Sequence, residues 1–195
     1  MKSDILKLDG TIESNEKALD KVETLANYFG FDLRDILIVR LLAEEGTKAI
    51  SNILKFNSGQ LWVETDHKNF DIHIKVNTFL EENQKKEIIA MSKDKSNTPQ
   101  KGILGKISMI MDYIFFGTGI QSNACYYGLS YDVIPSGYTY YWSMSEAWNS
   151  DKKETKLIKD EFEGIEQSII EKFADDIVVT VLTNNAELVI KKIKK

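Results

Sequence analysis

A stretch in the middle of the chain, Phe70-Asp71-Ile72-His73-Ile74-Lys75-Val76, alternates between apolar and polar side chains. A period of two is typical of a β-strand that buries one face and leaves the other polar. Residues 60–66 have a similar pattern, and Asp66 to Asn69 predict the turn of a hairpin between the two strands. The sheet therefore needs a layer of helices to cover its apolar face.

Two helices are predicted upstream of this hairpin. The first has Ser14 or Asn15 as its N-cap, continues to about Tyr28 and ends at Gly30. Its apolar stripe predicts one buried face, formed by Leu19, Val22, Leu25 and Ala26.

The second helix is predicted to begin after Asp32 and to cover about residues 33–54. Its first half, Ile36 to Leu42, is apolar almost all round. This composition predicts a helix that is buried on every side.

The remaining elements follow the same logic. The predictions are a strand at 4–12, helices at 81–91, 103–116 and 152–174, an aromatic β-hairpin within 117–150 and a final strand pair at 176–182 and 186–193. Hairpins mixed with helices predict an α/β sandwich, with a mixed, mainly antiparallel sheet and helices on one face. We expect one domain over residues 1–195, with the aromatic hairpin as an insertion.

Composition narrows the classes of function. The chain has 195 residues, 43% of them hydrophobic, and a formal net charge of −5, which disfavours nucleic acid and anionic membranes as partners. Cys125 is the only cysteine, and the N-terminus has no apolar signal core, so we expect a cytoplasmic protein. His67 and His73 have no clear carboxylate partner in the sequence, and no metal site is predicted.

Two glycines mark a candidate anion site. Gly102 and Gly105 precede the apolar-periodic segment 107–116, with Lys101 and Lys106 beside them. Backbone N–H groups at a helix start can bind a phosphate where no side chain intervenes. The alternative is that the glycines only end a loop and allow close packing on the sheet.

The second helix carries polar side chains on its later half. Glu44, Lys48 and Asn52 stand four residues apart, and Glu45 lies beside them. Such an arc can place a carboxylate next to a water molecule and a side-chain ligand next to a metal-bound triphosphate. The alternative is a solvated face on which Glu44 and Lys48 form an i,i+4 ion pair.

The order of these elements resembles the ATP-binding domain shared by histidine kinases, gyrase-type ATPases and anti-sigma-factor kinases. The segments that carry the resemblance are Leu41-Leu42-Ala43-Glu44-Glu45 and Lys101-Gly102-Ile103-Leu104-Gly105-Lys106. The resemblance covers about residues 4–116 and is greatest to the anti-sigma-factor serine kinases. It implies a histidine kinase-type fold that binds ATP or ADP.

The site residues that the resemblance implies are partly altered. Glu44 matches the family's glutamate, whereas Lys48 stands where the family has an asparagine that holds Mg²⁺, and Asn52 follows. A charged lysine cannot ligate a cation, so Mg²⁺ binding in the family's manner is doubtful. Asn77 stands near the family's adenine-reading aspartate, without the glycines that follow it there, and the later motif is kept as Gly102, Gly105 and Lys106.

We therefore expect a degenerate member of this class, a regulatory protein with weak or altered nucleotide binding at Glu44, Lys48, Asn77 and the glycine turn. Glu44 or Glu45 would orient a water, but efficient catalysis is not expected without Mg²⁺. It would act through a protein partner, such as a sigma factor or an anti-sigma-type regulator. The alternatives are an interaction module without nucleotide, with the aromatic hairpin as its surface, and an active serine kinase. The sequence leaves the oligomeric state open.

Overall fold

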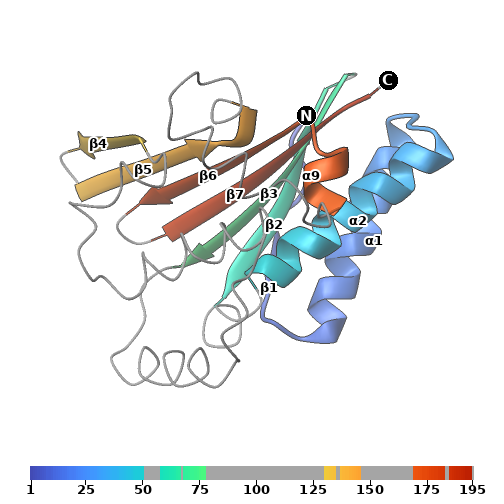
Figure 1. Cartoon of the computed structure of the whole chain (residues 1–195). Helices are drawn as coiled ribbons and strands as arrows, with labels where there is room; N and C mark the ends of the chain where they lie inside the picture. Colours follow the sequence, from blue (N-terminus) through green and yellow to red (C-terminus); the bar gives the residue numbers. More distant parts are fainter. Residues whose placement is uncertain are drawn as a thin grey trace, which may run out of the picture.

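The computed structural model describes residues 1–50, 58–66, 68–77, 130–134, 137–145, 169–182 and 185–194. The chain begins with β1 (Leu6–Leu8), α1 (Ile12–Tyr28) and α2 (Leu33–Ala49), and continues with β2 (Gly59–Thr65) and β3 (Asn69–Asn77). After a long interval come β4 (Ser130–Ile134), β5 (Gly137–Ser143), α9 (Ile169–Phe173), β6 (Asp176–Leu182) and β7 (Asn185–Ile193). Figure 1 shows a sheet with α1, α2 and α9 gathered on one side of it.

The strands form one seven-stranded sheet in the order β1-β2-β3-β7-β6-β5-β4. Every pairing between the described strands is antiparallel, so the prediction of a mixed sheet is wrong for this part of the chain. A parallel pair needs a crossover that returns the chain to its starting end, usually one helix. Here two helices, α1 and α2, lie between β1 and β2. The second helix carries the chain back to the end of the sheet where β1 ended, so β2 runs antiparallel to β1.

The face of the sheet toward the helices is apolar. In β3 the predicted alternation is confirmed, because Phe70, Ile72, Ile74 and Val76 are all at most 1% exposed. The α1 stripe is confirmed as well, and its side chains are buried with them in one cluster that includes Leu19, Val22, Leu25 and Ala26. The coarse prediction of a sheet with helices on one face is therefore correct.

Both helices begin at an N-cap whose side chain accepts a hydrogen bond from the backbone N–H three residues further on. Asp32 caps α2 as predicted, and its side chain accepts a hydrogen bond from the Asp35 N–H. The N-cap of α1 is Thr11, three residues before Ser14 and four before Asn15, which were the predicted caps. The sequence hides this start because the first helical residue, Ile12, is 83% exposed and does not belong to the buried stripe. Gly30 follows α1 with a φ of +71°, as its predicted role as terminator requires.

A glycine inside α2 sets the distance between this helix and the sheet. A Cβ atom on Gly46 would lie 2.7 Å from Ile74 Cδ1 and 2.8 Å from Ile190 Cδ1. The α2 backbone therefore packs directly against β3 and β7, and any larger residue would have to displace core side chains.

Two predictions about α2 are wrong. The helix ends at Ala49, with Ile50 as its C-cap, rather than at about residue 54. Burial on every side is also wrong, because Leu37 is 58% exposed and Leu41 is 39% exposed. A single layer of helices has a sheet on one side only, so an apolar outward face stays uncovered.

The aromatic hairpin is part of the same sheet. Its strands β4 and β5 pair as predicted around residues 134–137, and β5 also pairs with β6. Of the predicted helix at 152–174, the described part is α9. The predicted helices at 81–91 and 103–116 lie outside the described residues.

Candidate functional site

The polar arc of α2 is only partly described. Lys48 Nζ lies 2.6 Å from Glu44 Oε1, with side chains that are 67% and 38% exposed. This is the ion pair predicted as the alternative, and at such exposure it stabilises the helix by a few tenths of a kcal/mol. The positive charge of Lys48 is therefore already balanced by Glu44.

Glu45 lies differently from its neighbour. Its Oε2 atom is buried, and within the described part of the chain it has no hydrogen-bond partner. Burying a carboxylate oxygen without a partner costs free energy, so such an atom is suited to accept a hydrogen bond from a bound donor. Among the predicted site residues that the structure describes, Glu45 is the one with a buried side-chain oxygen that has no hydrogen-bond partner.

Of the other predicted nucleotide ligands, Asn77 is the one that lies in the described part of the chain. Asn77 ends β3 opposite Asn185, and its backbone N–H lies 3.5 Å from the carbonyl oxygen of Ser58. Asn52, Gly102, Gly105 and Lys106 lie outside the described residues, as does the loop that precedes the glycine turn. The meeting of the glycine turn with the acidic helix thus stays a prediction.

The outward face of α2 carries a row of leucines that sequence reasoning missed. Leu33, Leu37 and Leu41 are 82%, 58% and 39% exposed, and they stand four residues apart. Residues four apart lie one above another on a helix, so the row extends about 12 Å along it. We call this row the leucine column. The sequence shows the apolar row itself, but the exposure of the row depends on what covers α2, which the apolar pattern does not state.

A groove lies between α2 and α1 beside the leucine column. It has a volume of about 410 Å³, and its lining residues are Asp20, Glu23, Thr24, Asn27, Leu33 and Ile36. Arg40 bridges the two helices there, donating to Asp20 and Glu23 at 2.8 Å and to Glu16 at 3.1 Å. Asp20 and Glu23 raise the pKa of Arg40, the hydrogen bond to Asp20 most of all. The groove is therefore acidic on its α1 side and apolar on its α2 side.

The opposite face of the sheet holds a second cluster, which contains one of the two histidines. His73 Nδ1 lies 2.7 Å from Glu187 Oε1, and the His73 ring stacks on Trp62 with centroids 4.8 Å apart. The Trp62 indole N–H donates to Glu64 at 3.0 Å, and the Lys2 ammonium lies 4.5 Å from the Trp62 ring centroid. The pKa of Glu64 is lowered by its hydrogen bonds to Lys2 and Trp62.

The carboxylate partner that the sequence did not reveal for His73 is thus Glu187. His73 Nε2 is buried and has no hydrogen-bond partner within the described segments. With Glu187 accepting from Nδ1–H, the neutral ring would keep Nε2 as an acceptor. His67 lies outside the described residues, and the described residues contain no group of three or more side chains that could hold a metal ion.

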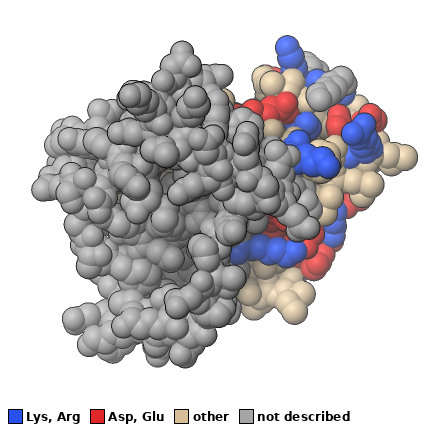
Figure 2. Space-filling model, in the orientation of Figure 1, with Lys and Arg blue, Asp and Glu red and all other residues tan. Residues whose placement is uncertain are grey.

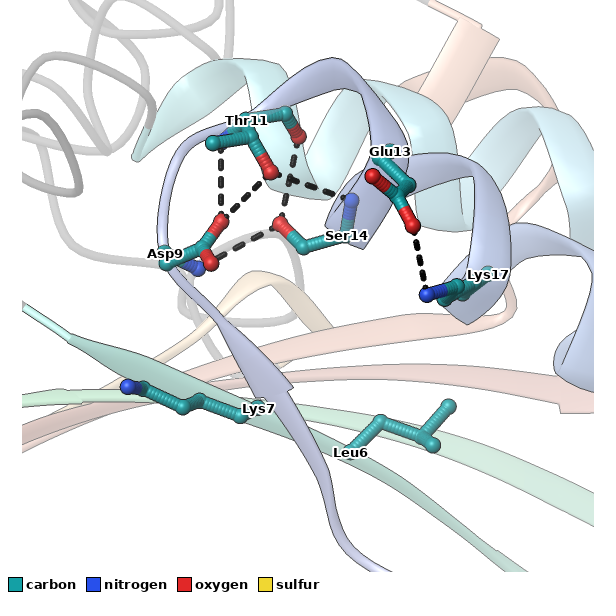
Figure 3. Close-up of a pocket in the computed structure, with 7 residues that line it drawn as sticks. All are labelled: Leu6, Lys7, Asp9, Thr11, Glu13, Ser14 and Lys17. Atoms are coloured by element: carbon teal, nitrogen blue, oxygen red, sulfur yellow. Dashed lines mark hydrogen bonds and ion pairs between the residues drawn. The ribbon is translucent and has the colours of Figure 1, made fainter.

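A second hollow, of about 340 Å³, lies at the start of α1 (Figure 3). Asp9 accepts hydrogen bonds from the N–H and hydroxyl of Thr11, and Thr11 accepts one from the Ser14 N–H. Hydrogen bonds with the Thr11 side chain, then with the Ser14 side chain and the Thr11 backbone, lower the pKa of Asp9 to about 2. The polar groups satisfy one another, which is the arrangement of a structural helix cap.

Comparison of the chain with models of known protein families and with curated protein sequences found no match. The resemblance to the histidine kinase-type ATP-binding domain therefore stays a prediction from the sequence. In the described part of the chain no helix is long and apolar enough to cross a membrane.

Proposed function

We propose that this protein is a regulator that acts by binding another protein through the outward face of its α1–α2 layer. The observation that carries the proposal is the leucine column, Leu33, Leu37 and Leu41, on a helix whose other side is in the core. Scattered exposed apolar residues are normal, but a contiguous row beside a groove is typical of an interaction surface. The resemblance suggests a sigma factor or an anti-sigma-type regulator as the partner.

Quantitative affinity purification from the cells that produce the protein tests this proposal. We expect at least one protein to be retained by the unchanged chain and lost with the double variant Leu33→Ser, Leu37→Ser. The matched control is Ile12→Ser, because Ile12 is 83% exposed but lies on the first turn of α1, away from the column. Equal retention of every protein by the unchanged chain and the double variant would refute the proposal.

Glu45 favours a second candidate function, the binding of a nucleotide beside α2. Its buried and unpartnered Oε2 is an acceptor available for a bound water or a ligand hydroxyl. Under the family resemblance this acceptor would face ATP or ADP held by the glycine turn at 102–106. Lys48, paired with Glu44, would contribute less to such a site than a free ammonium.

Calorimetric titration with ATP and ADP, each with and without Mg²⁺, tests nucleotide binding. We expect weak binding that Glu45→Gln changes several-fold and Glu44→Gln changes less, because Glu44 is already paired with Lys48. The absence of both heat and a thermal shift at millimolar nucleotide would exclude this second function. That outcome would leave an interaction module without nucleotide.

A further inference from the structure

From the groove between α1 and α2, we infer that the partner docks an amphipathic helix whose apolar side covers the leucine column and whose basic edge faces α1. This inference rests on the proposed function and names the chemistry of the partner. Asp20 and Glu23 form the α1 wall of the groove, and Leu33 belongs both to the groove and to the leucine column. One bound segment would therefore meet carboxylates on one edge and leucines beneath it.

The net charge of the groove determines whether the edge of the partner helix that faces α1 should be basic or acidic. Three carboxylates, those of Glu16, Asp20 and Glu23, share the single guanidinium of Arg40, which leaves an excess of two negative charges. The Arg40 side chain is 26% exposed, whereas those of Glu16 and Asp20 are 57% and 68% exposed. A partner would thus meet the acids first, with their cation held between the helices. Figure 2 shows acidic and basic side chains side by side on the part of the helical layer that is visible there.

The shape of the apolar surface favours a helix as the bound segment. A column that extends about 12 Å matches the apolar stripe of about two turns of helix, which presents residues at i, i+3, i+4 and i+7. A groove beside the column gives that helix a place for its long side chains. Lysine and arginine can lay their apolar stems along Leu33 while their charged ends reach the α1 carboxylates.

A second copy of the chain is a less suitable occupant. The chain has a net charge of −5, and self-association would bring two acidic molecules together. Charge complementarity instead favours a basic partner, and it would speed association as well as select the partner.

The probe is a fluorescent synthetic peptide of about 18 residues, with leucines at helical spacing and lysines along its edges. Anisotropy titration with the full chain should give an affinity about tenfold higher than for the same peptide with glutamates in place of lysines. The affinity should fall as salt is raised, since the contacts are exposed. A peptide with serines in place of the leucines should not bind.

Variants of the chain localise the binding. The double variant Asp20→Asn, Glu23→Gln should weaken the lysine peptide about fivefold, and Leu37→Ser about tenfold. The matched control is Arg34→Gln, an exposed charge on α2 outside the groove lining, which should leave the affinity unchanged or raise it. Light scattering with size-exclusion chromatography should show that the leucine variants do not alter the oligomeric state.

Two outcomes would overturn this inference. One is equal binding of the lysine and glutamate peptides, or no binding of either. The other is a dimer of the unchanged chain that Leu37→Ser dissociates, which would make a second copy the occupant. If the affinity purification still shows a partner that depends on the leucine column, the proposed function stands and only the chemistry of the partner is wrong.

Discussion

The two faces of β3 carry different chemistry, although they belong to the same nine residues. Toward the helices, Phe70 and Ile72 are 0% exposed and belong to the hydrophobic core. On the other face, His73 is paired with Glu187 and stacked on Trp62, and Trp62 is itself only 7% exposed. Burial on the helix face is thus apolar, whereas burial on the other face depends on polar pairs that span the sheet.

This difference predicts different costs for substitutions on the two faces. On the helix face, a truncation loses transfer free energy and leaves a cavity, because the neighbours are closely packed. On the other face, a truncation removes a hydrogen-bond partner and leaves a polar atom unsatisfied. Stability measurements on matched variants can separate the two effects.

The largest loss is expected for Phe70→Ala. Phe70 is fully buried and its ring meets that of Phe31 edge-to-face at 5.3 Å, so the variant should lose about 3–5 kcal/mol of unfolding free energy. Urea unfolding followed by circular dichroism measures this. The control is Lys75→Ala on the other face of β3, which should change stability by about 0.5 kcal/mol or less. Equal losses for both variants would contradict the contrast between the faces.

Gly46→Val is the next test, and it probes the contact between α2 and the sheet. A valine side chain has no room against Ile74 and Ile190, so we expect a loss of about 1–3 kcal/mol from overpacking. Gly46→Val does not lower helix propensity, because valine is a better helix former than glycine. Lys48→Val on the same helix shows what a β-branched residue costs at an exposed site. If both variants lose the same stability, the close approach of α2 is not what requires glycine.

A smaller loss is expected for Glu187→Ala on the polar face. His73 Nδ1 would lose its partner while Nε2 already has none in the described segments, and the cost should be about 1–2 kcal/mol. Lys2→Ala, on the exposed side of Trp62, should cost about 0.5 kcal/mol or less. NMR of the His73 ring should show a change in its tautomer in the first variant and none in the second.

The sequence was informative wherever a pattern is local. The alternation of β3 gave its buried face, and Asp32 gave the start of α2 through a hydrogen bond three residues along the chain. The turn at Asp66 was predictable in the same way, because its carboxylate accepts from the N–H groups of Lys68 and Asn69. In each case the interacting atoms are within a few residues, so local geometry decides the outcome.

Features that depend on distant neighbours could not be predicted. His73 and Glu187 are 114 residues apart and meet only because β3 pairs with β7, where Glu187 is the diagonal neighbour of His73. The exposure of Leu37 likewise depends on how many layers cover α2, which its own apolar pattern does not state. In the candidate site, local reasoning correctly offered the Glu44–Lys48 pair as an alternative, and it did not single out Glu45 from Glu44.

The smallest expected effect is a difference in pH dependence between two aspartates of the β2–β3 hairpin. Hydrogen bonds from the backbone of Asn69 and Lys68 lower the pKa of Asp66 to about 2 from an ordinary value near 3.8. Burial raises the pKa of Asp71, although the charge of Lys191 opposes that shift. The two groups should therefore change stability with pH in opposite directions.

The sign for each group follows from linkage. The folded state favours ionised Asp66, so its stabilisation is present above the unfolded pKa of about 3.8 and is lost as pH falls toward 2. The folded state favours protonated Asp71, so its contribution is greatest below the unfolded pKa and declines as pH rises through the higher folded pKa.

The two contributions can be separated by urea unfolding between pH 2 and 6. The midpoints to compare are those of the unchanged chain, Asp66→Asn and Asp71→Asn. Relative to the unchanged chain, Asp66→Asn should lose less stability on acidification and Asp71→Asn should lose more, because each variant removes one of the two opposing contributions. If both variants shift the profile in the same direction, the polar face does not desolvate Asp71 as its burial implies.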